Sequence, residues 1–391
     1  MPAVLRLFLL VSLILGAFSS TGCDSADIVS TVTIVDPGCV QTLPVARPPS
    51  DTDGADIPEQ VFVFRDWDFL PTTPNNGFDL DGICSTDSDS LSCAPKGGEG
   101  VFDGVGGTDN SYATQIAPQV RLFAALSGKN PQQDLRDVQA KGQFDVLLRV
   151  RGWNGLDDDP QVEVDFMETV CGLADGRPES DCTDESAPAL AWDGTDVFRV
   201  SPRSLLSGDE NRSLVVDDNA YVADRQLVAE LPNSVNLSFP LRGKAVYVGF
   251  TDARFIVPLP APGEVEIPIA VLSARWPRQS AAEALTFVTD CPSDTDLDAV
   301  SFNTIMDLAM DIRADPSDDH MDLECNAMSI AITMAGYRGV YGGIGTGRDV
   351  RRSCDDPVPD AGSDAGSDAG SDAGSDAGSD AGSDAGPDAG P

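Results

Sequence analysis

Short runs of alternating apolar and polar residues recur through the middle of the chain. The run Phe144–Arg151 places apolar side chains at every second position, and Val162–Phe166 repeats the pattern. Alternation with a period of two is typical of strands with one buried face, and Gly, Pro and Asp separate the runs. These runs predict a mainly β fold, an antiparallel β-sandwich of the jelly-roll or lectin-like kind. The other expected strands are Val61–Phe64, Trp67–Leu70, Leu227–Leu231, Val235–Phe239, Ala245–Phe250 and Val265–Ile269.

Two segments have the spacing of amphipathic helices instead. Tyr112–Leu126 and Ser301–Ile312 place apolar residues three and four positions apart, so each is expected to pack one helical face on the sheet. The apolar segment Ala327–Tyr341 is expected to be a buried strand. Two or three short helices are therefore predicted. The chain lacks the strand–helix–strand rhythm of a doubly wound fold.

The first 22 residues have the pattern of an export signal. Arg6 precedes the uncharged stretch Leu7–Phe18, which is too short to cross a bilayer but suits the core of a signal peptide. The run Ser20-Thr21-Gly22-Cys23 resembles the lipobox of secreted bacterial lipoproteins, and this resemblance implies that Cys23 is the lipid-attachment residue. Such signals usually have Leu where this chain has Ser20. Ordinary signal-peptide cleavage, giving a secreted product, is therefore the alternative.

Composition divides the rest of the chain into three parts. Residues 23–60 are rich in Pro, Asp and Thr and are expected to form a lipid-anchored tether. Residues 61–354 contain the expected strands and form the predicted β-sandwich domain. Residues 355–391 form a tail that repeats Asp-Ala-Gly-Ser from Pro359 onward and contains no large apolar residue apart from Val358. Because such a repeat cannot bury a core, this tail is predicted to be disordered.

The number of cysteines fits an exported protein. Of nine cysteines, eight remain when Cys23 is assigned to the lipid, an even number that suits complete oxidation outside the cytoplasm. The chain has no Cys-x-x-Cys pair, which argues against zinc ribbons and thioredoxin-type chemistry. Spacing along the chain suggests the disulfides Cys84–Cys93, Cys171–Cys182, Cys291–Cys325 and Cys39–Cys354.

The charge of the chain is strongly negative. There are 25 basic and 64 acidic residues, which give a formal net charge of −39. Such a chain repels nucleic acid, which is therefore excluded as a partner. The excess of Asp has three possible origins: an acidic surface suited to a saline habitat, a GC-rich genome, or calcium binding.

One acidic loop offers a specific calcium hypothesis. Asp79 and Asp81 precede Gly82 in the way that the third and fifth ligand positions precede the glycine of an EF-hand loop. Gly77 and Ser88 stand where an EF-hand has its first acid and its last glutamate, so the EF-hand is incomplete. A looser calcium site is expected to take its oxygens from Asp79, Asp81, Asp87 and Asp89. The alternative is a solvated acidic loop. Asp157-Asp158-Asp159 forms a second acidic cluster.

Few catalytic arrangements are open to this chain. Its single histidine, His320, lies among aspartates, and there is no His-Glu-x-x-His, Walker glycine loop or Gly-x-Ser-x-Gly motif. A carboxylate-dependent hydrolase, similar to a glycosidase, is the remaining enzymatic possibility. Glu163 and Asp165 are the regularly placed acids for it. The expectation is nevertheless a protein without enzymatic activity or a required cofactor.

Several short phrases resemble a known group of proteins. They are Gly77-Phe78-Asp79-Leu80-Asp81-Gly82, Gly106-Gly107-Thr108-Asp109-Asn110, and Arg149-Val150-Arg151-Gly152-Trp153-Asn154-Gly155 followed by Asp159-Pro160. They are similar to phrases in uncharacterised acidic, cysteine-containing lipoproteins of myxobacterium-like bacteria. The resemblance implies a cell-envelope protein and supplies no catalytic residue.

Together these patterns predict a lipoprotein of the bacterial cell envelope with a binding or structural role. Its expected partners are the membrane, through the lipid anchor, and a glycan or a surface protein. Aromatic platforms for stacking on sugar rings are expected near turns. The tryptophans that suit this role are Trp67, Trp153 and Trp192.

Overall fold

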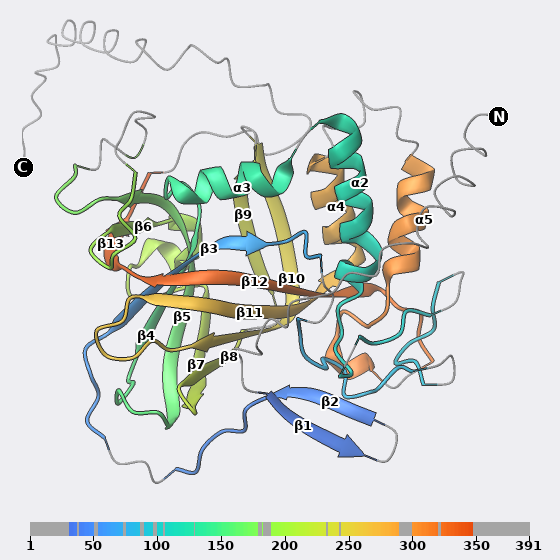
Figure 1. Cartoon of the computed structure of the whole chain (residues 1–391), viewed down its shortest axis with the longest axis horizontal. Helices are drawn as coiled ribbons and strands as arrows, with labels where there is room; N and C mark the ends of the chain where they lie inside the picture. The colour runs from blue at the N-terminus through green and yellow to red at the C-terminus, as the bar shows by residue number, and fades with distance from the viewer. Residues whose placement is uncertain are drawn as a thin grey trace, which may run out of the picture.

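The centre of the structure is an antiparallel sheet that closes on itself (Figure 1). The computed structural model describes residues 31–346 except 37–38, 51–53, 73–75, 87–89, 97–99, 105, 129, 179–181, 183–188, 232–233, 242–243, 289–298 and 320–321. Eight strands follow one another around the sheet: β5 (Asp159–Leu173), β4 (Val146–Arg151), β3 (Gln60–Asp68), β12 (Ala327–Arg338), β11 (Glu266–Pro277), β10 (Lys244–Pro258), β8 (Gln226–Glu230) and β7 (Val215–Ala223).

The closure distinguishes this fold from the expected sandwich. Strand β7 pairs with β8 on one side and with β5 on the other, so the eight strands form a barrel. The mainly β, antiparallel architecture is confirmed, whereas two packed sheets are not. Strands β5 and β10 are each 15 residues long, and β5 is long enough to pair with β4, β6 and β7. Alternating patterns report which face of a strand is buried but not which strands meet at the seam.

Aromatic side chains fill the barrel. The ring of Phe255 lies 4.9 Å from that of Phe64 and 5.8 Å from that of Phe166, in edge-to-face contact. Alternate residues of β4 belong to two different clusters: Val146, Leu148 and Val150 share the main core with these phenylalanines, whereas Leu147 packs with residues of the outer wall. The interior is therefore a packed core.

Five further strands of the described chain lie around the barrel. β6 (Val197–Val200) pairs with β5, and β13 (Val340–Ile344) adds to β6 in parallel. β9 (Val235–Leu241) forms a hairpin with β10, and β1 (Thr31–Asp36) forms a separate hairpin with β2 (Cys39–Pro44).

The helices gather at one end of the barrel (Figure 1). The predicted helix over 112–126 is observed as η1 (Tyr112–Ile116) followed by α2 (Ala117–Ser127), and the second as α5 (Ala299–Ala309). Together with α2, α3 connects β3 to β4, and α4 and α5 connect β11 to β12. The helices that the sequence pattern did not predict are α3 (Pro131–Ala140) and α4 (Arg278–Val288), with the single turns η3 (Pro202–Ser204), η4 (Leu206–Gly208) and η5 (Pro316–Asp318).

Two predicted strand segments merge into one. Val61–Phe64 and the first two residues of Trp67–Leu70 lie in the single strand β3, which continues through the charged pair between them and ends at Asp68. Asp66 has a φ of 55°, and the register with β12 shifts at this point. A β-bulge therefore accommodates the charged pair Arg65 and Asp66 within the strand, and the strand continues beyond it.

Of the four suggested disulfides, one is confirmed and two are wrong. Cys171–Cys182 is present. Cys93 is bonded to Cys325, which excludes both Cys84–Cys93 and Cys291–Cys325. The reason is backbone pairing between distant segments: the amide of Ala94 donates to the Leu323 carbonyl (2.8 Å), and the amide of Cys325 donates to the Ala94 carbonyl (2.9 Å). Cys84 is also disulfide-bonded. The suggested Cys39–Cys354 bond, like Cys23 and Cys291, lies outside the described side chains.

Candidate metal centre

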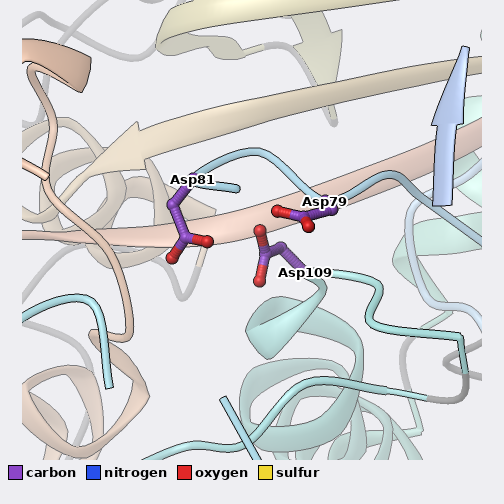
Figure 2. A group of neighbouring side chains, drawn as sticks. All are labelled: Asp79, Asp81 and Asp109. Carbon is purple, nitrogen blue, oxygen red and sulfur yellow. The ribbon is translucent and has the colours of Figure 1, made fainter. Parts of the chain in front are cut away.

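Three aspartates meet beneath a loop on the outer wall of the barrel. Carboxylate oxygens of Asp79, Asp81 and Asp109 all lie within 4.8 Å of one another. Figure 2 shows the three carboxyl groups turned toward each other. The side chains are buried, with exposed fractions of 1%, 8% and 3%. Three acids in so small a volume repel one another unless protons or a cation neutralise them.

The loop backbone fixes the orientation of each carboxylate. Asp79 accepts a hydrogen bond from the Gly82 amide (2.6 Å), and Asp81 accepts one from the Ile83 amide (2.8 Å). Asp109 accepts one from the Leu80 amide (2.6 Å). One oxygen of each acid is thus held in place. The local turn requires a glycine, because Gly82 has a φ of +76°.

One oxygen of this group has no hydrogen-bond partner. Asp79 Oδ2 is buried and no N–H or hydroxyl group donates to it, although the Asp79 and Asp81 carboxyls are in hydrogen-bond contact when one of them holds a proton. Buried polar atoms in proteins nearly always have a partner, so each exception calls for an explanation. A cation bound among the three carboxylates would supply the missing interaction.

Two further acids adjoin the three. Asp103 accepts a hydrogen bond from the Ser85 amide (2.7 Å) and is in hydrogen-bond contact with the Asp109 carboxyl. Asp311 accepts bonds from the backbone amide (2.8 Å) and the hydroxyl of Ser329 on β12. The cluster of Asp79, Asp81, Asp103, Asp109 and Asp311 is called the aspartate cluster below. It joins segments more than 200 residues apart.

Burial makes it energetically unfavourable for all the carboxyl groups of this cluster to be ionised at once. Desolvation raises the pKa of Asp79 and of Asp311 to about 7, and that of Asp103 to about 6. Burial raises the pKa of Asp109 well above its usual range, and the charges of Asp81 and Asp103 add to the effect. Without a cation, Asp79 and Asp311 are about half protonated at neutral pH; with one, the carboxylates would be anionic ligands.

The donor set matches calcium. Ca²⁺ is bound by oxygen at about 2.3–2.6 Å, so ligands on opposite sides of the ion are about 5 Å apart. The 4.8 Å limit for the three carboxylates fits this spacing. Zinc favours Cys and His, and the cluster has neither. Magnesium usually keeps several waters and is held by only one or two carboxylates, which suits this acid-rich site less well.

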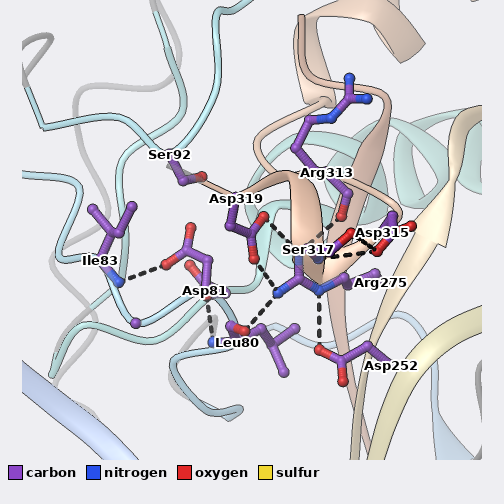
Figure 3. A network of polar contacts seen from close by, with 12 residues as sticks. Leu80, Asp81, Ile83, Ser92, Asp252, Arg275, Arg313, Asp315, Ser317 and Asp319 are labelled. Atoms are coloured by element: carbon purple, nitrogen blue, oxygen red, sulfur yellow. Dashed lines mark hydrogen bonds and ion pairs between the residues drawn. The ribbon is translucent and has the colours of Figure 1, made fainter. Parts of the chain in front are cut away.

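An arginine from the barrel wall holds the loop from below (Figure 3). Arg275 on β11 is fully buried and makes two bonds to Asp319, at 2.8 and 2.6 Å. The same guanidinium donates to Asp252 (3.1 Å) and to the Leu80 carbonyl (2.6 Å). Because Leu80 lies between Asp79 and Asp81, this network positions the two candidate ligands.

The structure brings together only part of the predicted calcium loop. Asp79 and Asp81 lie in the cluster, whereas Asp87 and Asp89 lie outside the described residues. The other ligand candidates, Asp103, Asp109 and Asp311, come from distant loops. The second acidic run does not form such a group among the described residues. Asp157 pairs with Arg225, Asp158 accepts from the Asp224 amide, and Asp159 accepts from the Asn154 amide.

Comparisons with known proteins give no further guide: no family model, curated protein or solved structure matches this chain. Within the described part of the chain, no helix is long and apolar enough to pass through a bilayer. The chemistry of the site therefore rests on its own geometry.

The aromatic platforms expected for sugar stacking are largely absent. Trp67 and Trp153 are buried, with exposed fractions of 2% and 4%, so the expectation is wrong for both. Their indole N–H groups are bonded to carbonyls of Phe64 and Leu156. Trp192 is partly exposed, but the Arg65 guanidinium already lies over its ring at 4.4 Å.

The acids expected for hydrolysis are committed to ion pairs. Asp165 is fully buried and lies 2.8 Å from the Nε atom of Arg149, and Glu163 pairs with Arg151. A different acid on β5, Glu168, reaches a cavity of about 170 Å³ beside β9 and β10. Burial raises the pKa of Glu168 to about 7. No motif in the sequence distinguishes it from the other acids.

Proposed function

We propose that the chain is a calcium-stabilised protein of the bacterial cell envelope, with a binding or structural role and a lipid anchor at Cys23. The observation that carries the calcium part is the unpartnered oxygen of Asp79 among buried carboxylates. The cation would join the loop around residue 80, the loop before η1 and the segment after α5. Its role would be structural, because the ligands are buried and the cavities of about 170 and 600 Å³ are lined by other residues.

Adding calcium is expected to raise the melting temperature. At a concentration about 100 times the dissociation constant, a ligand adds about 2.7 kcal/mol to the stability of the folded state. For a domain of this size that corresponds to a shift on the order of 5–10 °C. Thermal unfolding at pH 8, followed by circular dichroism in millimolar Ca²⁺, Mg²⁺ or chelator, measures it.

Asp109→Asn is the variant that isolates the cluster. An asparagine resembles the protonated carboxyl and keeps the acceptor for Leu80, so the variant should fold but lose the calcium shift. The matched control is Asp218→Asn, the same Asp-to-Asn replacement at an exposed position. Equal melting temperatures of the wild type in calcium and in chelator would count against the proposal.

Export is supported by the oxidised cysteines. The Cys93–Cys325 and Cys171–Cys182 bonds are typical of proteins outside the cytoplasm. Cys23→Ser is expected to move the protein from the membrane fraction to the soluble fraction, because the thioether anchor is lost. Fractionation of cells followed by immunoblotting measures this. A variant that stays with the membranes would place the anchor elsewhere.

For the hydrolase alternative, the described residues around the smaller cavity supply only one of the two carboxyl groups that a glycosidase needs. Glu168 has the raised pKa that a general acid needs. A glycosidase needs a second carboxylate about 5–9.5 Å away, and Glu168 is the only acid among the described residues lining its cavity. Glu168 also accepts a hydrogen bond from the Ser238 amide, which ties it to strand β9. Binding without turnover is therefore the better supported function.

A further inference from the structure

A second cavity lies at the end of the barrel opposite the helices. Its volume is about 600 Å³, within the range of small-molecule sites. Its walls come from the start of β3, the β4–β5 loop, the β7–β8 turn, the β10–β11 loop and the end of β12, together with residues 193–195 before β6. In an antiparallel barrel these strand ends share one mouth, where barrels commonly bind ligands.

Two arginines face this cavity in a chain that is otherwise strongly acidic. The guanidinium of Arg338 donates to the Glu264 carbonyl (2.8 Å) and to the side chain of Gln60, and the described residues give it no carboxylate partner. Arg225 donates to the Pro260 carbonyl (2.9 Å). Its only described ion pair is with the exposed Asp157, at 3.3 Å. Burial lowers the pKa of Arg338, and the positive charge of Arg225 lowers it further. This agrees with two guanidinium groups that lie close together at the same cavity.

The acids in the cavity wall do not neutralise these arginines directly. Asp193 accepts from the amide (3.0 Å) and the hydroxyl (2.6 Å) of Thr195, within its own turn. The Glu264 carboxylate accepts from the Ala261 amide (3.1 Å), also within its own loop. Both carboxylates therefore serve local turns. The two guanidiniums keep donors for an anion that enters from solvent.

The rest of the lining suits a sugar ring. Pro260 and Pro262 supply apolar surface, Trp153 adds only its small exposed part, and Gln60 and Thr195, which also bond within the wall, supply polar groups for hydroxyls. Arginine is the side chain best suited to holding a carboxylate through two hydrogen bonds. We propose that this cavity binds the carboxylate of a uronic acid in a glycan, which specifies the ligand class of the binding role proposed above.

Titration calorimetry with glucuronate as the probe tests this on the whole folded chain. Glucuronate is expected to bind the wild type, while glucose, which lacks the carboxylate, should not. Arg338→Gln or Arg225→Gln should weaken binding about tenfold or more, because a charge-assisted contact is lost. The control is Arg212→Gln, which changes an exposed arginine away from the cavity. Circular dichroism of each variant verifies that it is folded.

Two outcomes would overturn the inference. One is glucose binding as tightly as glucuronate, or neither binding. The other is inorganic phosphate binding more tightly than glucuronate, which would identify a general anion site. The calcium shift in melting temperature is measured on the same samples. If calcium still raises the melting temperature but glucuronate does not bind, the uronate inference is wrong and the proposal of a calcium-stabilised fold is retained.

Discussion

Replacing Arg275 by leucine should destabilise the protein by about 3–5 kcal/mol, the largest effect expected of any single substitution in the chain's polar networks. The guanidinium is buried and bridges Asp319, Asp252 and the Leu80 carbonyl. Its removal leaves the buried Asp319 carboxylate, and the partly exposed Asp252, without this counter-charge. Urea unfolding in saturating calcium, monitored by tryptophan fluorescence, gives the change in free energy.

The control for this experiment is Arg212→Leu. Arg212 is exposed, so its replacement is expected to change stability by no more than about 0.5 kcal/mol. Arg275→Leu should also weaken calcium binding, because Leu80 lies between Asp79 and Asp81. A loss of stability no larger than that of the control would show that the network in Figure 3 does not hold the loop.

Without calcium, stability should fall as the pH rises from 5 to 8. The pKa values of Asp79 and Asp311 in the folded chain are about 7, and that of Asp103 is about 6, against 3.8 for an ordinary aspartate. A raised pKa means that the folded state holds protons which the unfolded state has released. The stabilisation is therefore complete below about pH 4 and is lost as the pH passes through 6 and 7.

The expected loss between pH 5 and pH 8 is on the order of 7 kcal/mol, because one pKa unit corresponds to about 1.4 kcal/mol and the range covers about two units for each of Asp79 and Asp311 and about one for Asp103. Calcium should remove most of it by replacing the protons in the cluster. Glu168, with a pKa raised to about 7, adds a loss of the same sign that calcium does not reverse. Glu168→Gln therefore separates the two contributions. Urea unfolding between pH 5 and pH 8 in chelator measures the slope, and stability that rises with pH would contradict the account.

The sequence predicted the strands better than their assembly. Alternation in Phe144–Arg151 and Val162–Phe166 predicted strands with one buried face; β4 and β5 are found there, but β4 is buried on both faces. Closure of the barrel depends on backbone hydrogen bonds between β5 and β7. The alternation of apolar and polar residues within a strand does not indicate which other strand it pairs with. The start of α3 had visible signals, because Asn130 caps it and Pro131 occupies the first turn, but its polar pattern is too short to stand out.

The candidate site was predictable only where its ligands are close in sequence. Asp79 and Asp81 stand next to Gly82, and this spacing identified them. Asp109 and Asp311 reach the cluster because neighbouring residues bind β12: Asn110 accepts from the Ala331 amide (3.2 Å), and Asp311 itself binds Ser329. In a chain with 64 acidic residues, spacing cannot select such distant partners.

The most direct test of the calcium-stabilised fold is a count of bound calcium. Equilibrium dialysis of the purified chain against Ca²⁺ at pH 8, followed by elemental analysis, gives the ions bound per chain. Tight binding of one calcium ion per chain, retained in Asp218→Asn and lost in Asp109→Asn, is the predicted result. No tightly bound calcium in the wild type, or equal binding in both variants, would contradict the assignment of the aspartate cluster.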